Sequence, residues 1–198
     1  MDPKGKIALV TGGAHRVGKA LVLGLARAGA DVAIHFHSSR EAALETLGEV
    51  ESLGRRGMIA SADLSDPSAP RQLVDRVQEE LGGLDILVNS ASLFESAPFA
   101  EITAAEWDRV QAVNTRAPFL LTQAAAPLMG ETGVVVNIAD LSGVQVWPSF
   151  AHHGVSKAGL IHLSRIAARA LAPVRVNCIV PGTVLPPGDY TEGQVERS

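Results

Sequence analysis

The chain has 198 residues, of which 46% are hydrophobic, 19% charged and 4% aromatic. This composition fits one globular domain with a sizeable core and excludes a disordered or collagen-like chain. The formal charge of -4 argues against a nonspecific nucleic-acid binder, and the single Cys178 cannot form an internal disulfide. No apolar stretch approaches the ~20 residues that span a bilayer. We therefore expect a soluble protein in the reducing cytoplasm, without nucleic acid or membrane as partner.

Short β-branched runs alternate with Ala- and Leu-rich segments along the chain. Six strands are predicted, at 6–11, 31–37, 57–62, 84–89, 133–138 and 174–180. Helices are predicted at 16–28, 40–53, 68–81, 104–128 (one bent helix or two) and 151–171. This alternation is typical of strand-helix units around a parallel sheet, and the continuously apolar strands indicate helices on both faces. The expected fold is α/β, a doubly wound Rossmann-type parallel sheet in one domain over 1–198.

The final segment, 181–198, is rich in Gly, Pro and acidic residues and contains no further predicted strand. A doubly wound domain of this kind normally adds another helix and strand, which need ~20 or more residues. We therefore expect the domain to be truncated at its C-terminus, with the last helix and strand missing.

The residues 11–18 read TGGAHRVG and lie between the first predicted strand and the first predicted helix. Glycine lets the backbone approach a pyrophosphate, and the amides and dipole at a helix start favour an anion. The spacing departs from a plain GxGxxG, because Arg16 stands where a middle glycine often lies. The segment predicts a dinucleotide site; a tight turn without a ligand is the alternative.

The end of the second strand, ~20 residues further on, is where an NAD site carries Asp or Glu for the ribose hydroxyls. The sequence there is HFHSSR, over 35–40, with no acidic residue. Its cationic and hydroxyl side chains suit a 2'-phosphate; they are His37, Ser38, Ser39 and Arg40. NADPH is therefore predicted in preference to NADH. A metal pair formed by His35 and His37, or a solvated strand end, are the alternatives.

Three titratable residues are expected to meet at one cleft. Lys157 follows His153 by four residues in the last long helix, so both side chains project from one helix face. Asp140 ends the fifth strand, at the edge where doubly wound sheets bind ligands. An acid, an imidazole and an ammonium group so placed would perturb each other's pKa and could deliver a proton to a substrate undergoing reduction.

Together with these features, the chain resembles the short-chain dehydrogenases/reductases along its whole length. The motifs occur in the family's order, at 11–18, Asp63-Leu64, Asn89-Ser90-Ala91, Asn114, Ser156-Lys157-Ala158 and Pro181-Gly182. The resemblance implies that the helices carrying Asn114 and Lys157 form a homodimer or homotetramer. It also implies further cofactor contacts beside the 2'-phosphate residues 37–40. These are Gly12, His15, Arg16, Val17, Gly18, Asp63, Leu64, Asn89, Ala91, Lys157, Pro181, Gly182 and Val184.

Several details resemble the pteridine reductases within that family. These are Arg16 in the first loop, the HFHSS run after the second strand, and Asp140 in place of the usual catalytic serine. Arg16, Ser92 and Phe94 match the place where such reductases hold a pterin. A flat bicyclic ring can lie between the nicotinamide and an aromatic face. The alternative for Phe94 is an aromatic residue that anchors its loop.

One departure concerns the family's proton-donating tyrosine, whose position is occupied by His153. The resemblance gives Lys157 and Asn114 the roles of holding the nicotinamide ribose and supporting a water chain. His153 could act as a substitute acid, with Asp140 as its partner or as the actual donor. It could instead be idle, or catalysis could have been lost. The chain's single tyrosine, Tyr190, lies in the loop that covers the active site in relatives.

The sequence thus predicts an NADPH-dependent reductase with Asn114, Asp140, His153 and Lys157 as its catalytic residues. The expected substrate is a small conjugated C=N or C=O compound, with a pterin-like ring as the best fit. Two alternatives are left open. One is a 3-oxoacyl or ketone reductase, which predicts Ser and Tyr at positions 140 and 153, and the other is a non-catalytic NADPH-binding protein.

Overall fold

The computed structural model describes residues 2–182 and 184. Tyr190 and most of the segment 181–198 therefore lie outside the described residues. Six parallel strands form one sheet in the order β3-β2-β1-β4-β5-β6. The strands are β1 (Ile7–Val10), β2 (Asp31–Phe36), β3 (Gly57–Ser61), β4 (Ile86–Asn89), β5 (Val134–Ile138) and β6 (Arg175–Ile179). The predicted doubly wound fold is confirmed, and each strand lies within its predicted range.

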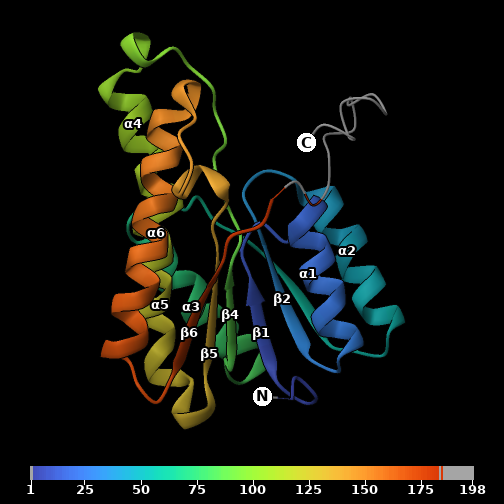
Figure 1. Ribbon diagram of the computed structural model, residues 1–198. Helices are drawn as coiled ribbons and strands as arrows, with labels where there is room; N and C mark the ends of the chain where they lie inside the picture. Colours follow the sequence, from blue (N-terminus) through green and yellow to red (C-terminus); the bar gives the residue numbers. More distant parts are fainter. Residues whose placement is uncertain (1, 183, 185–198) are drawn as a thin grey trace.

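Six α-helices connect or flank these strands. They are α1 (Arg16–Arg27), α2 (Arg40–Ser52), α3 (Ala69–Leu81), α4 (Ala104–Gln111), α5 (Ala117–Ala125) and α6 (Ala151–Ala170). Figure 1 shows α1 and α2 on one side of the sheet and α3, α5 and α6 on the other. Two buried apolar clusters, one on each face, form the core. In the described part of the chain, the helices are too short or too polar to cross a membrane.

The strand order reverses at β1, which pairs with β2 on one side and β4 on the other. In open parallel sheets such a switch point opens a crevice at the carboxyl ends of the strands, where ligands bind. The loop after β1, the end of β4 and the end of β5 therefore lie at one edge of the sheet. Several predicted site residues come from these segments, among them Gly12, Asn89 and Asp140.

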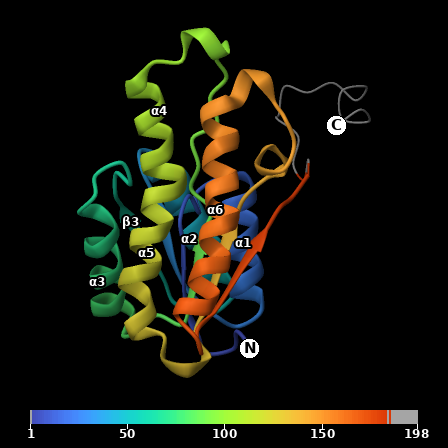
Figure 2. The ribbon, with the colours of Figure 1, turned by 60° about the vertical axis from the view of Figure 1, so that its left-hand side comes forward.

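The helical region predicted at 104–128 is divided in the structure. A capping box between Thr103 and Glu106 starts α4, and a π-helical turn over Ala112–Arg116 separates it from α5. Figure 2 shows α4 and α5 running beside α6. Asn114 lies in the π-helical turn, and such turns are frequent at functional sites.

Candidate active site

The glycine loop is shaped by two close backbone approaches. Gly12 has φ of +66°, and a Cβ there would lie 3.0 Å from Cα of Ala91. A Cβ on Gly18 would lie 2.0 Å from the carbonyl oxygen of Gly12. Only glycine fits at position 18 without a shift of backbone, because the obstacle is a carbonyl group rather than a flexible side chain. The loop therefore places backbone without side chains at the sheet edge.

The amino end of α1 follows this loop and is suited to an anion. Its first turn contains no acidic side chain, and no side chain caps it. The helix dipole and the first-turn amides therefore favour a phosphate there. Arg16 begins the helix with φ of +46°, the one positive value at a non-glycine residue among the described residues. The backbone here thus keeps the left-handed geometry that the usual middle glycine would permit.

Thr11 holds the end of β4 against the glycine loop. Its Oγ1 accepts hydrogen bonds from the backbone N–H groups of Ser90 and Ala91, each at 3.0 Å. Asn89 is buried, and its side-chain amide donates to Oδ1 of Asn137 at 2.7 Å. The segment predicted to contact the cofactor is therefore tied to both the loop and the sheet.

The end of β2 presents exposed polar side chains beside the end of β3. His37, Ser38 and Arg40 are exposed, and Nδ1 of His37 lies 3.7 Å from Oδ1 of Asp63. Hydrogen bonds from the Ser65 hydroxyl and amide lower the pKa of Asp63. Ser39 precedes α2, and Leu64 is buried. The structure thus brings together the predicted 2'-phosphate and adenine contacts.

His35 has an environment different from that of its neighbour His37. Its ring is buried, with Nδ1 at 3.1 Å from the Gly12 backbone nitrogen and Nε2 at 3.1 Å from the Ala62 carbonyl oxygen. Both nitrogens are therefore engaged, which argues against the metal pair considered for His35 and His37. Among the described residues no group of three His, Cys, Asp or Glu side chains could hold a metal ion.

Asp140 and His153 form an ion pair at the end of β5. Nε2 of His153 lies 2.6 Å from Oδ2 of Asp140, and Oδ1 of Asp140 accepts from the amide and hydroxyl of Ser142. Burial raises the pKa of Asp140, but hydrogen bonds from His153 and Ser142 outweigh it and lower the pKa overall. The Asp140 side chain is 23% exposed and that of His153 only 1%. Asp140 is therefore the member of the pair that is open to the cleft.

The other ring nitrogen of His153 also faces an acceptor. Nδ1 lies 2.9 Å from the Leu93 carbonyl oxygen, which also accepts from the Asn114 amide at 3.0 Å. Asn114 in turn accepts from the Leu93 N–H and donates to the Ser156 hydroxyl. Nδ1 of His153 also lies 3.3 Å from the Asn114 amide nitrogen, so the ring is held on one side by the Leu93 carbonyl and Asn114 and on the other by Asp140.

Lys157 lies beneath this pair, as its spacing from His153 predicts. Its side chain is buried, and Nζ donates to the Ile138 carbonyl oxygen at 3.0 Å. Burial lowers the pKa of Lys157, while the nearby Asp140 carboxylate opposes the shift. The predicted group of acid, imidazole and ammonium is therefore assembled at the end of β5.

An aromatic wall, formed by Phe94, Trp147 and Phe150, stands over the ion pair. The rings of Phe94 and Phe150 stack with centroids 4.5 Å apart, and Phe94 meets His153 edge-on at 4.8 Å. Trp147 lies edge-on to Phe94 at 6.5 Å. Phe94 is 59% exposed, so an aromatic face is open to a ligand. Ser92, on the same loop, is also exposed.

The pair Pro181-Gly182 lies beyond β6, and a Cβ on Gly182 would be 3.7 Å from the Leu141 side chain. Val184 is exposed. Sequence reasoning missed Ser142, Phe150 and the inward position of His35. Ser142 could have been found as a hydroxyl two residues after Asp140, a spacing that favours a local side-chain hydrogen bond.

Known proteins share this fold. A profile described as short chain dehydrogenase matches residues 6–194. The chain belongs to the short-chain dehydrogenase family. It is 33% identical over 192 residues to an uncharacterized oxidoreductase of Methylorubrum extorquens, covering 96% of this chain and 77% of that protein. This short-chain dehydrogenase is therefore an oxidoreductase of a family that uses nicotinamide cofactors.

Two solved structures illustrate the cofactors of similar proteins. A short chain dehydrogenase from Burkholderia cenocepacia in complex with NADP is 38% identical, with a TM-score of 0.93, covering 100% of this chain and 83% of that chain. An NAD+-bound xylitol dehydrogenase is 33% identical, with a TM-score of 0.89, covering 99% of this chain and 76% of that chain. Both phosphorylated and unphosphorylated dinucleotides thus occur among similar structures.

Proposed function

We propose that this protein is an NADPH-dependent reductase of a small conjugated C=N or C=O substrate, with a pterin-like ring as the best fit. The observation that carries the proposal is the Asp140–His153 ion pair at the end of β5, with Lys157 beneath it and the aromatic wall above it. This arrangement offers a proton, a positive charge and a flat apolar face at one place. A reductase needs these elements beside its hydride source.

The residues at the sheet edge fit a phosphorylated dinucleotide. Gly12 and Gly18 let the loop pack closely against Ala91 and against itself, and the acid-free start of α1 favours the charge of a pyrophosphate. His37 and Arg40 at the end of β2 suit the 2'-phosphate, and Asp63 suits the adenine amine. When bound, the nicotinamide supplies the hydride that such a reduction requires.

The proton would reach the substrate through Asp140. The Asp140 carboxylate takes the Nε2 proton of the His153 imidazolium at Oδ2. It passes a proton to the nitrogen or oxygen of the substrate. The substrate gains a hydride and a proton, and His153 is left neutral until solvent restores its proton. Asp140 is then the catalytic acid, because His153 is buried and acts through it.

Lys157 and Asn114 would support this route in different ways. The ammonium group of Lys157 favours the ionised form of Asp140 between turnovers. Asn114 fixes the Leu93 carbonyl, which holds Nδ1 of His153. The ring is thus oriented with Nε2 toward Asp140.

The aromatic wall supports the choice of a flat substrate. Phe94 is stacked on Phe150 and still has more than half of its area exposed. A conjugated bicyclic ring would bury apolar area there, while Ser92 and Arg16 could bond its polar edge.

A substrate panel tests the proposal. Purified protein is incubated with NADPH and oxidised pterins, quinones or ketones, and NADPH oxidation is followed by absorbance. We expect turnover with a pterin and slower turnover with simple ketones. Tight NADPH binding without turnover of any compound, with activity gained in His153→Tyr, would instead establish the non-catalytic alternative. That alternative is motivated by His153 standing where the family has its tyrosine. A preference for ketones would favour the ketone reductase.

A further inference from the structure

We propose that His35 is a positioning residue that fixes the glycine loop at a set distance from the adenine end of the nucleotide site. The proposal rests on the proposed NADPH site, because it explains what sets the distance between the glycine loop and the adenine end of that site. His35 lies in β2, between the loop that follows β1 and the end of β3. Its ring touches both of these segments.

The first contact is with the glycine loop. The Gly12 N–H donates to Nδ1 of His35 at 3.1 Å, and the Gly13 N–H donates to the His35 carbonyl oxygen at 2.9 Å. One residue thus engages both amides of the glycine pair. Because these two amides donate to His35, they are not available to a phosphate. The backbone amides at the amino end of α1 are then the ones that can bind it.

The second contact is with the end of β3. Nε2 of His35 lies 3.1 Å from the carbonyl oxygen of Ala62, the residue before Asp63. With Nδ1 as acceptor and Nε2–H as donor, the partners define one neutral tautomer. The ring is 2% exposed, and burial lowers its pKa from an ordinary 6.5 to about 4. The Ala62 carbonyl opposes this shift and the nearby His37 adds to it.

Two substitutions separate the contacts. In His35→Asn the amide oxygen takes the place of Nδ1 and can accept from Gly12, but the side chain is too short to reach Ala62. In His35→Gln the amide nitrogen takes the place of Nε2 and can donate to Ala62, but it leaves Gly12 without an acceptor. His35→Leu removes both contacts. His162→Leu, at an exposed position of α6, is the matched control.

The experiment has two readouts. Amide hydrogen exchange of Gly12 is measured without nucleotide, and the NADPH dissociation constant is measured by fluorescence. We expect Gly12 to lose protection in the Gln and Leu variants but to keep it in the Asn variant. NADPH binding should weaken about tenfold or more in the Leu variant, with kcat at saturating NADPH within about twofold. The control should match the unsubstituted protein in both readouts.

Acid titration adds a test on the unsubstituted protein. Protonation would turn Nδ1 into a donor facing the Gly12 N–H, so Gly12 protection should be lost as the pH falls toward 4. Nitrogen NMR of the ring should show the Nε2–H tautomer above that pH. A ring protonated at Nδ1, or unchanged Gly12 exchange in the Leu variant, would overturn the inference. Failure of the unsubstituted protein to bind NADPH would overturn the proposed function, whereas Gly12 exchange would still decide the role of His35.

Discussion

At the scale of single residues, the ion pair combines one buried and one open partner. The imidazole of His153 is enclosed by the Leu93 carbonyl, Asn114 and the aromatic wall, whereas the carboxylate of Asp140 reaches the cleft. Removing either partner leaves the polar group of the other without its hydrogen bond, and for the enclosed imidazole this loss is costly. The two residues should therefore act as a unit.

The charge at the end of β2 should determine which dinucleotide binds. In a double variant, His37→Ala with Arg40→Ala, the loss of hydrogen bonds to the charged 2'-phosphate should weaken NADPH binding ~100-fold or more, since each bond is worth ~1.5–3 kcal/mol and ~1.4 kcal/mol corresponds to tenfold in affinity. NADH binding should change less than about twofold. Fluorescence titration measures both. Arg27→Ala, at an exposed site on the far end of α1, serves as control. Equal affinities for NADH and NADPH in the unsubstituted protein would contradict the assignment.

The site residues differ in how far the sequence could place them. Spacing alone put Lys157 and His153 on one helix face, and the end of β5 placed Asp140 near them. The burial of His153 could not be predicted, because it depends on a carbonyl 60 residues away in sequence. The inward position of His35 depends likewise on backbone groups of the β1 loop and β3.

At the scale of elements, strands were easier to predict than helix interruptions. The β-branched runs are continuous because helices cover both faces, so β1, β2 and β4 stand out in the sequence. The π-helical turn inside the region 104–128 leaves no such pattern. Within this turn the Thr115 hydroxyl donates to the Ser156 carbonyl oxygen of α6, a contact between segments distant in the sequence.

The start of α1 offers a prediction for one element. In Gly18→Ala the added Cβ would meet the Gly12 carbonyl oxygen at 2.0 Å, so the loop must shift. We expect the free energy of unfolding to fall by ~1–3 kcal/mol and NADPH binding to weaken at least ~tenfold. A Cβ on Gly24, in the same helix, would meet no atom within 4 Å, so Gly24→Ala should raise the free energy of unfolding by ~0.5–1 kcal/mol. Urea unfolding and fluorescence titration measure these effects. If Gly18→Ala and Gly24→Ala had the same free energy of unfolding and the same NADPH affinity, the steric explanation would be refuted.

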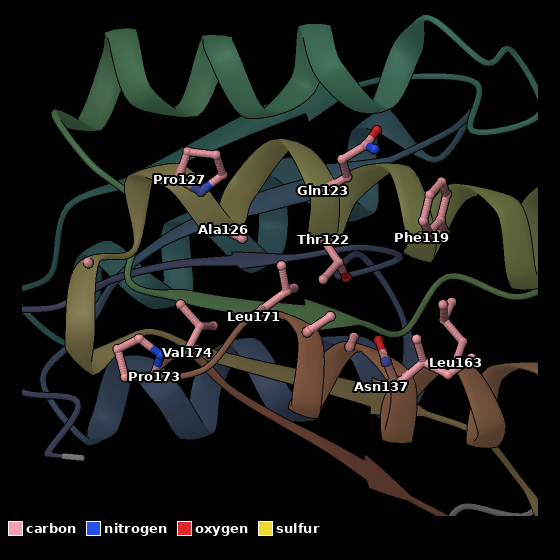
Figure 3. A pocket seen from close by; sticks show the side chains of 14 residues that line it. Phe119, Thr122, Gln123, Ala126, Pro127, Asn137, Leu163, Leu171, Pro173 and Val174 are labelled. Atoms are coloured by element: carbon pink, nitrogen blue, oxygen red, sulfur yellow. The ribbon is translucent and has the colours of Figure 1, made fainter.

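At the scale of the whole molecule, a groove of about 460 Å³ lies between α5 and α6 (Figure 3). It is lined mainly by apolar side chains, including Phe119 of α5 and Leu163 of α6. Phe119 is 45% and Ile166 54% exposed at its rim. Because the resemblance implies assembly through these helices, we propose that a second copy of the chain covers this face.

Self-association should therefore depend on this face. Phe119→Asp and Ile166→Asp should each convert a dimer or tetramer into a monomer, because a charge would be buried in an apolar contact. Light scattering after size-exclusion chromatography measures the mass. Leu44→Asp, on α2 at the opposite face of the sheet, should leave the mass unchanged. A monomeric unsubstituted protein at high concentration would contradict the proposed assembly.

The central claim is that Asp140 delivers a proton supplied by His153. Its most direct test is the single-turnover rate of NADPH oxidation with an oxidised pterin, compared among the unsubstituted protein, Asp140→Ala, His153→Phe and the double variant, with His162→Phe as control. The account predicts that each single variant is at least ~100-fold slower and that the double variant is no slower than Asp140→Ala, with NADPH affinity unchanged. A His153→Phe rate equal to that of the unsubstituted protein would contradict it.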